Sequence, residues 1–208
     1  MRRTSGLVLA ALLLSTACSG FGSSAPRTRQ WAEGPVRWLL LPAEEREIQE
    51  LRSDAEGRLF MDEFWRRRDP DPGVPGNPVQ EAFEERVEIA DRAYGDTGQR
   101  GSLTDRGRAL VLLGAPSLMR HGRRKVPAWR PGQRATDRGS DRMPVRELVA
   151  ETWEYGLGDL PTGLIALLEE REEAGVSLLF LLENDGSRLV DGEKYLEWAA
   201  QSLVQLVP

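Results

Sequence analysis

The chain has 208 residues, a net charge of −5 and 40% hydrophobic residues, enough for one domain with a substantial core but not for two. The acidic balance argues against nucleic-acid binding, because contacts with phosphates need a positive surface. One Cys and one His exclude an internal disulfide and argue against a metal site built on these residues, and we expect no cofactor.

The N-terminus has the pattern of a targeting segment. Arg2 and Arg3 precede the apolar run Gly6–Leu14, which is far shorter than the roughly 20 residues of a membrane-spanning helix. We therefore predict a signal peptide over residues 1–17, and its removal would leave a mature charge of −7. Residues 18–30 are rich in Ser, Gly and Pro and are predicted to form a flexible tether.

Cys18 follows the small residue Ala17, and the sequence Ser15-Thr16-Ala17-Cys18 resembles the lipobox of bacterial lipoproteins, although Ser15 stands where Leu is usual. The resemblance implies cleavage before Cys18 and acylation of that residue, which anchors the chain in a membrane. By the same analogy, Ser19 favours the outer membrane, with the domain facing the periplasm. The alternative is an ordinary signal peptide followed by a chance Cys.

Three helices are predicted next. The first starts at Pro42, where acids in the first turn suit the helix dipole. Ser53 is a plausible cap for the second helix, Ala55–Arg68, and Asn77 caps the third. Their apolar residues recur at helical spacing and are predicted to be core. These residues are Leu59, Phe60, Phe64, Phe83, Val87, Ala90 and Tyr94.

The second helix runs into a charged turn. Arg66–Arg68 precede Asp69 and Asp71, each of which is followed by a proline that favours extended geometry before it. The arginines could pair with the aspartates and fix the turn, or they could form an anion-binding site.

The stretch Gly101–Pro116 has turn residues on both sides of the apolar run Ala109–Leu113. This pattern predicts a buried strand. Thr104 and Asp105 suit a turn in which side chains hold backbone N–H groups. Asp105 could also pair with Arg106, Arg108 or the Arg66–Arg68 cluster.

The order of several motifs resembles the GWxTD domain family of bacterial envelope proteins, which are often lipoproteins. The matching motifs are Phe64-Trp65, Arg68-Asp69-Pro70, Asn77, Gly101, Thr104-Asp105-Arg106, Leu112-Leu113-Gly114 before Pro116, and the later Trp153-Glu154-Tyr155. The resemblance implies no biochemical activity. It implies binding positions at Trp65, Arg68, Asp69, Pro70, Asn77, Gly101, Thr104, Asp105 and Arg106. Ser102 stands where the family has its name-giving Trp.

Residues 117–144 form a basic segment with scattered Gly and Pro. We expect a mobile insertion that is either merely solvated or makes an electrostatic contact over 120–142 with anionic lipid, lipopolysaccharide or an acidic partner, helped by Trp129. His121, in the same segment, is expected to be a surface residue.

The remaining chain is predicted to hold the sheet and a last helix. Val149–Gly156 and Val176–Leu182 are expected strands, and Asn184-Asp185-Gly186 is a hairpin turn that returns through Ser187–Val190. Leu160–Arg171 is compatible with either a strand or a short helix. Asp191–Val207 is predicted to be a helix.

The overall expectation is one α+β domain over 31–208, with N-terminal helices packed on a small, mainly antiparallel sheet and a C-terminal helix. The preferred function is that of a lipid-anchored envelope protein that binds an envelope protein partner, without catalysis, through the Arg-Asp-Pro turn and the Thr-Asp loop. One alternative is a hydrolase of envelope carbohydrate or peptide that uses Asp69, Asp71 and Asp105. The other is a small anion-binding module built on Arg66–Arg68.

Overall fold

The computed structural model describes residues 25–95, 98–128, 145–183 and 186–203. The predicted signal peptide, Cys18, Trp129 and the turn residues Asn184 and Asp185 lie outside these ranges. Within them the helices are α1 (Pro26–Glu33), α2 (Pro42–Glu50), α3 (Asp54–Arg66), α4 (Pro78–Tyr94), α5 (Asp105–Leu113), α6 (Thr162–Glu170) and α7 (Glu193–Ser202). The short 3-10 helices are η1 (Pro35–Trp38), η2 (Gly101–Leu103) and η3 (Leu157–Asp159). The strands are β1 (Leu118–Pro127), β2 (Val145–Gly156), β3 (Gly175–Glu183) and β4 (Gly186–Asp191).

The four strands form one antiparallel sheet in the order β1-β2-β3-β4, so each strand pairs with its neighbour in sequence. Together with the helices, this confirms the predicted α+β class. β1 and β4 are the two edge strands. No helix in the described ranges is both long and apolar enough to cross a membrane.

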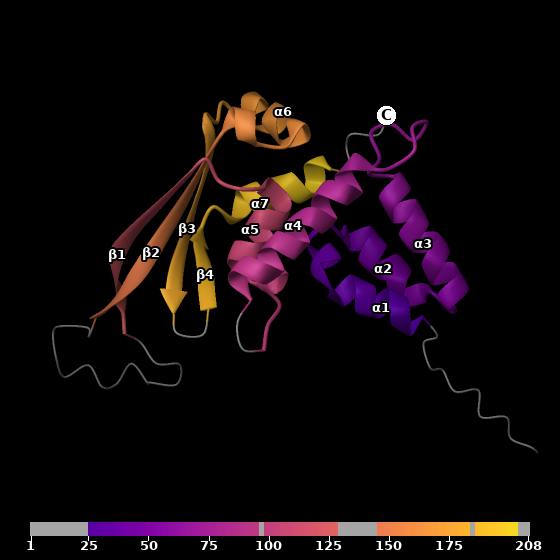
Figure 1. Cartoon of the computed structure of the whole chain (residues 1–208), viewed down its shortest axis with the longest axis horizontal. Coiled ribbons are helices and arrows are strands. Elements are labelled where there is room, and N and C mark those ends of the chain that lie inside the picture. Colours follow the sequence, from indigo (N-terminus) through magenta and orange to yellow (C-terminus); the bar gives the residue numbers. More distant parts are fainter. Residues whose placement is uncertain (1–24, 96–97, 129–144, 184–185, 204–208) are drawn as a thin grey trace, which may run out of the picture.

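The helices lie to one side of the sheet along the long axis of the molecule (Figure 1). α4 reaches β2 directly, where the rings of Tyr94 and Trp153 lie 5.7 Å apart. α1, α2 and α3 form the end of the molecule farthest from the sheet (Figure 1). A single cluster of buried apolar side chains nevertheless includes residues from these helices and from β2 and β3.

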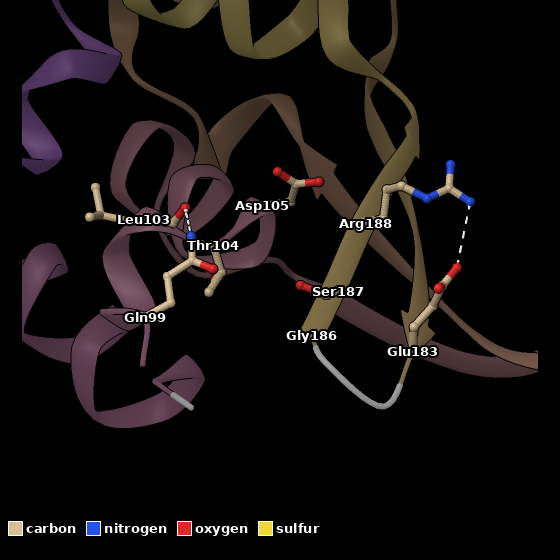
Figure 2. A pocket seen from close by; sticks show the side chains of 8 residues that line it. All are labelled: Gln99, Leu103, Thr104, Asp105, Glu183, Gly186, Ser187 and Arg188. Carbon is tan, nitrogen blue, oxygen red and sulfur yellow. Dashed lines mark hydrogen bonds and ion pairs between the residues drawn. The ribbon is translucent and has the colours of Figure 1, made fainter. Parts of the chain in front are cut away.

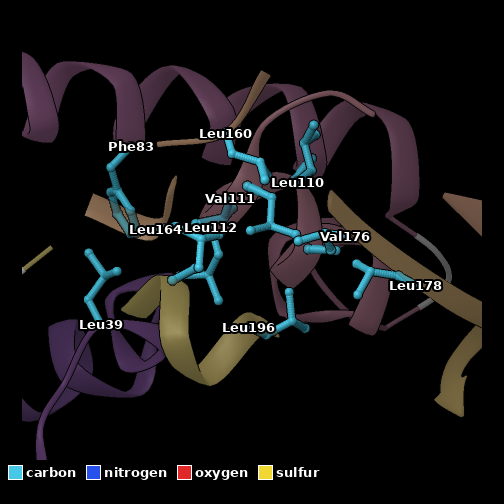
Figure 3. Packing of buried hydrophobic residues seen from close by; sticks show 14 of the residues in the cluster. Leu39, Phe83, Leu110, Val111, Leu112, Leu160, Leu164, Val176, Leu178 and Leu196 are labelled. Atoms are coloured by element: carbon cyan, nitrogen blue, oxygen red, sulfur yellow. The ribbon is translucent and has the colours of Figure 1, made fainter. Parts of the chain in front are cut away.

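α5 is the centre of this core. Ala109–Leu113 are all buried, and Figure 3 shows side chains of α5 beside Val176 and Leu178 of β3 and Leu196 of α7. The predicted buried strand at Ala109–Leu113 is therefore wrong, although its burial is confirmed. A short apolar run buried on all sides has no amphipathic period to separate helix from strand. The helix is set by its ends, Thr104 as the N-cap and Gly114 with φ of 87° after the last turn.

The predicted helix starts in the N-terminal half are confirmed. Pro42 begins α2, Ser53 caps α3 through a bond from the Glu56 N–H, and Asn77 caps α4 by accepting from Val79 and Gln80. One predicted core residue of α3 is wrong, because Leu59 is 69% exposed. Phe60 and Phe64, one and five positions farther on, face the interior instead, and both are buried.

Two further segments differ from the sequence prediction, and one segment that the sequence left open is a helix. Residues 26–30 of the predicted tether belong to α1, which starts at Pro26. Residues 118–127 of the predicted mobile insertion form β1, which pairs with β2 over its full length. The ambiguous segment Leu160–Arg171 contains helix α6. The C-terminal helix is confirmed as α7, over Glu193–Ser202 within the described ranges.

Candidate functional site

Arg68, a motif position expected to bind a partner, is fully buried. Its guanidinium donates to both carboxylate oxygens of Glu44, with Nη1–Oε1 at 3.0 Å and Nη2–Oε2 at 2.8 Å. It also donates to the carbonyls of Phe64 and Leu39, and it stacks 3.6 Å from the centre of the Phe64 ring. Arg68 therefore ties α3 to α2 and to the end of η1, and it is not available to a ligand.

The other arginines of the charged turn also pair with glutamates. Arg66 binds Glu63 on its own helix, and Arg67 lies 3.6 Å from Glu44 and 3.8 Å from Glu63. These contacts contradict pairing of the arginines with Asp69 and Asp71. They also argue against a common anion site, because the fully buried guanidinium of Arg68 is already paired with Glu44 through two hydrogen bonds. Asp69 instead accepts from the backbone N–H of Asp71, which fixes the turn locally.

The remaining motif residues of this region connect the end of α3 to the start of α4. Asn77 caps α4 and also donates to the carbonyl of Trp65 at 2.8 Å. The Trp65 ring packs at 5.3 Å from Phe83 of α4. Pro70 is exposed and lines an apolar cavity beside the start of α4. Of these positions, Pro70 presents the clearest surface to a ligand.

In the Thr-Asp loop, Thr104 bonds the backbone of its own turn, as expected from turn chemistry, whereas Asp105 bonds the backbone of β4. Thr104 accepts from the Gly107 N–H at 3.1 Å and donates to the Gly101 carbonyl at 2.7 Å. Asp105 accepts from the N–H of Leu189 at 2.6 Å. This hydrogen bond holds the first turn of α5 against the outer edge of β4, a contact that the sequence alone did not indicate.

The expected pairing of Asp105 with nearby arginines is not what the structure has. Arg106 lies 3.7 Å from Glu151 and its guanidinium stacks over the Tyr94 ring, while Arg108 pairs with Glu193 of α7. The arginines that flank Asp105 therefore connect α5 to β2 and α7, and not to the charged turn after α3.

Ser102, where the resembling family has Trp, is completely buried. Its backbone N–H and its hydroxyl both donate to Oδ1 of Asp91 on α4, at 2.8 and 2.6 Å, and its carbonyl accepts from the indole of Trp38 at 2.9 Å. Ser102 is therefore a junction between η1, η2 and α4. No contact with a ligand is needed to account for it.

Asp91 provides a test of this junction. Burial by itself raises the pKa of Asp91, but the hydrogen bonds from Arg100 and Ser102 outweigh it and hold the pKa below its ordinary value. A lowered folded-state pKa stabilises the fold at pH values above the ordinary pKa, and this stabilisation is lost as pH falls through the lowered value. We expect Asp91→Asn to lower the free energy of unfolding by about 1–2 kcal/mol at neutral pH.

The difference between wild type and Asp91→Asn should shrink as pH falls below the ordinary aspartate pKa of about 4. Urea unfolding at a series of pH values measures it. The matched control is Asp62→Asn, since Asp62 is an exposed residue of α3. A gap that stayed constant down to the lowest pH would show that ionisation of Asp91 contributes nothing.

Asp105 also lines a polar cavity of about 320 Å³ between the loop before α5 and the β3–β4 pair (Figure 2). Several of its polar groups already have partners within the chain, whereas the buried hydroxyl of Ser187 has none within the described ranges. Arg188 lies 3.7 Å from Glu183, and the Gln99 amide donates to the Leu103 carbonyl. Asp69 and Asp71 do not line this cavity. The convergence of three aspartates that the hydrolase alternative requires is therefore absent from it.

A buried carboxylate that the sequence analysis did not single out lies on the inner face of β2. Glu151 is 4% exposed, accepts from the Trp153 indole and lies 3.0 Å from Nε2 of His121. His121 itself is exposed, as expected. Because Trp153, His121 and Arg106 together surround the carboxylate, we interpret Glu151 as a structural link between β1, β2 and α5.

The described part of the basic segment is an edge strand. β1 has four basic residues and no acidic one, and nine of its ten residues are exposed. Pairing of β2 with β3 begins at Val149, so Arg124–Pro127 and Val145–Leu148 form a two-stranded extension beyond the sheet, here called the β1–β2 ribbon. Arg120 and Arg123 pair with acids of β2. Arg124 and Lys125 form no ion pair within the described ranges.

The described residues contain no group of three or more His, Cys, Asp or Glu side chains arranged to hold a metal ion. No family model, curated protein or solved structure matches the chain. The fold thus defines an α+β protein with one core, a four-stranded antiparallel meander and motif residues that serve mainly as internal contacts.

Proposed function

We propose that this chain is a lipid-anchored protein of the bacterial envelope with a binding or scaffold role and no catalytic one, whose protein partner adds an extended acidic segment to the free edge of β1. The sequence supports the anchor through the lipobox-like residues before Cys18, and the resemblance to the GWxTD family supports the compartment. The observation that carries the binding surface is the open, basic edge of β1.

The expected partner contact at the Arg-Asp-Pro turn and the Thr-Asp loop moves elsewhere in this proposal. The side chains of Arg68, Thr104 and Asp105 form hydrogen bonds within the chain. Replacing them would disturb the fold before it disturbed an interface. A surface that binds a partner needs side chains or backbone groups that are still free.

The two edges of the sheet differ in this respect. At β4, the Leu189 N–H is taken by Asp105, and α5 lies against the strand. Within the described ranges, β1 pairs with β2 on one side and with no strand on the other, so it is an edge strand. An unpaired edge offers a row of N–H and C=O groups that an extended segment of another protein can use, as in β-strand addition.

Charge decides which segment fits. Two copies of β1 would bring like charges together, which disfavours pairing of the strand with itself. An acidic segment could instead form ion pairs with Arg124 and Lys125 of the β1–β2 ribbon, which have no such partner within the described ranges. The same side chains thus reject one partner and favour the other.

The ribbon and the helices α1–α3 lie at opposite ends of the long axis (Figure 1). Since the proposed anchor at Cys18 precedes α1 in sequence, this arrangement favours a partner away from the anchoring surface. The basic edge therefore fits an acidic protein segment better than the head groups of the same membrane.

We expect Arg124→Glu/Lys125→Glu to reduce recovery of a stoichiometric partner at least tenfold when the lipidated full chain is purified from native membranes in mild detergent. Mass spectrometry of the eluate and of the Cys18 peptide identifies the partner and the lipid. The matched control is Arg27→Glu/Arg58→Glu, which changes net charge equally at exposed residues of α1 and α3.

A synthetic peptide that copies the acidic segment of the recovered partner should bind the wild type and the control, but not the ribbon variant. Three results would overturn the proposal. The lipidated protein could elute alone, the ribbon variant could retain the partner, or the ribbon variant could lose only its binding to anionic vesicles. An unmodified Cys18 would overturn the anchor without affecting the binding surface.

A further inference from the structure

A second cavity, of about 460 Å³, lies between the start of α4, α5, the start of α6 and the end of α7. This volume is in the range of cavities that hold small-molecule ligands. Its walls are largely apolar, formed by Pro70, Val79, Ala82, Phe83, Val111 and Pro161. A cavity with such walls holds an apolar group well, because few polar groups have to give up water.

One cation, Arg86, lines this largely apolar cavity, and Thr162 is the other polar residue among the described residues that line it. The Nη1 of Arg86 donates to the Val111 carbonyl at 3.4 Å, its only hydrogen bond within the described ranges. The guanidinium lies beside Gly114, where an added Cβ would come within 3.3 Å of Nη2. Arg86 thus lies at the C-terminal end of α5, where the helix dipole favours a positive charge.

Arg86 differs from the other arginines that lie inside the helical part. Arg68, Arg106 and Arg108 each have a carboxylate within 4 Å, from Glu44, Glu151 and Glu193. Arg86 forms no ion pair within the described ranges, although burial lowers its pKa. The carboxylate of Glu85 acts on Arg86 only from beyond ion-pair distance, so this partly buried guanidinium has donors left for an anion.

We propose that this cavity binds an amphipathic monocarboxylate, namely a medium-chain fatty acid, with the carboxylate on Arg86 and the acyl chain against Phe83, Ala82 and Val79. The site has a single guanidinium, which lies beside the carbonyl end of α5. It therefore balances a ligand with one negative charge better than a ligand with two, and this favours a carboxylate over a phosphate. The scarcity of polar side chains in the walls disfavours a peptide, whose backbone groups would lose water without replacement. The ligand site does not depend on the proposed partner at β1.

Isothermal titration calorimetry with octanoate tests the site directly. The full chain with Cys18→Ser is used, so that neither attached lipid nor detergent competes for the probe. We expect one octanoate to bind per chain, with octanol and octylamine binding at least about tenfold more weakly. Arg86→Met should weaken octanoate binding at least about tenfold, whereas Arg86→Lys should retain part of it.

Two further variants separate binding from folding. Arg92→Met removes an exposed arginine of the same helix and should leave octanoate affinity unchanged. Ala82→Trp fills the cavity while keeping Arg86, and it should abolish binding in a protein that circular dichroism shows to be folded. The proposal fails if octanoate does not bind, if octanol binds equally well, or if the folded Ala82→Trp variant binds as the wild type does.

Discussion

Replacement of Glu44 by Gln should lower the free energy of unfolding by about 3–5 kcal/mol, the largest effect expected from a single charge in this chain. Glu44 is 3% exposed and holds Arg68, which is fully buried, through two parallel hydrogen bonds. Without the carboxylate, a full positive charge would remain in a place where water cannot reach it. Bringing two charges out of water is costly, but leaving one of them unpaired costs more.

Glu44 has a second role at the start of α2. Its carboxylate also accepts from the Leu41 N–H at 2.9 Å, which satisfies a donor at the start of α2. Glutamine keeps an acceptor oxygen and could retain this bond. The loss expected for Glu44→Gln therefore comes mainly from the missing negative charge, and Glu44→Ala should be at least as destabilising.

Urea unfolding followed by circular dichroism measures the effect. Glu45→Gln, on the same helix turn but exposed, is the matched control and should stay within about 0.5 kcal/mol of the wild type. In the double variant Glu44→Leu/Arg68→Met, both charges are gone, and much of the lost stability should return. Equal stability of Glu44→Gln and Glu45→Gln would rule out the buried pair as a stabilising contact.

Gly101→Ala and Gly107→Ala should each lower the free energy of unfolding by about 3 kcal/mol, because each position lies against another stretch of backbone. A Cβ on Gly101 would lie 1.9 Å from the Ala90 carbonyl oxygen of α4. A Cβ on Gly107 would lie 1.8 Å from the Gly101 carbonyl oxygen. Backbone atoms cannot turn away as a flexible side chain can, so η2 would have to separate from α4 or from α5.

The control for these substitutions is the same change at glycines with open space. An added Cβ at Gly122 or Gly158 meets nothing within 4 Å, and alanine there should be neutral or slightly stabilising. Thermal unfolding of the four variants gives the comparison. If Gly101→Ala were as stable as Gly122→Ala, close contact of the η2, α4 and α5 backbones would not be the reason for glycine at this motif position.

Local signals were sufficient for the elements whose ends have distinct chemistry. Ser53 and Asn77 are caps that can be identified from sequence, and β3 has an apolar run bounded by turn residues. α5 and β1 were predicted wrongly for opposite reasons. The run Ala109–Leu113 of α5 is buried on every side and has no polar face, whereas β1 is exposed on both faces and has no apolar one. Neither pattern has the period on which such predictions rest.

The side-chain contacts of the candidate sites were harder to predict because they join distant parts of the chain. Glu44 and Arg68 are 24 residues apart, and Asp105 and Leu189 are 84 apart. For two of the buried charged side chains, the sequence nevertheless contained a partial clue. Glu44 lies one helical turn before the buried Ile48, and Arg86 lies three residues after the buried Phe83. A charged residue on the apolar face of a helix was the available clue to both.

The contact between Asp105 and Leu189 also affects how complexes can form through the sheet. Because Asp105 accepts the Leu189 N–H on the outer edge of β4, that edge offers fewer free backbone groups to an added strand than β1 does within the described ranges. A sheet open on both sides can join copy to copy into a fibre, since every added unit offers a new edge in the same direction. The contact of α5 with β4 therefore disfavours growth of this sheet from both edges, which such a fibre requires.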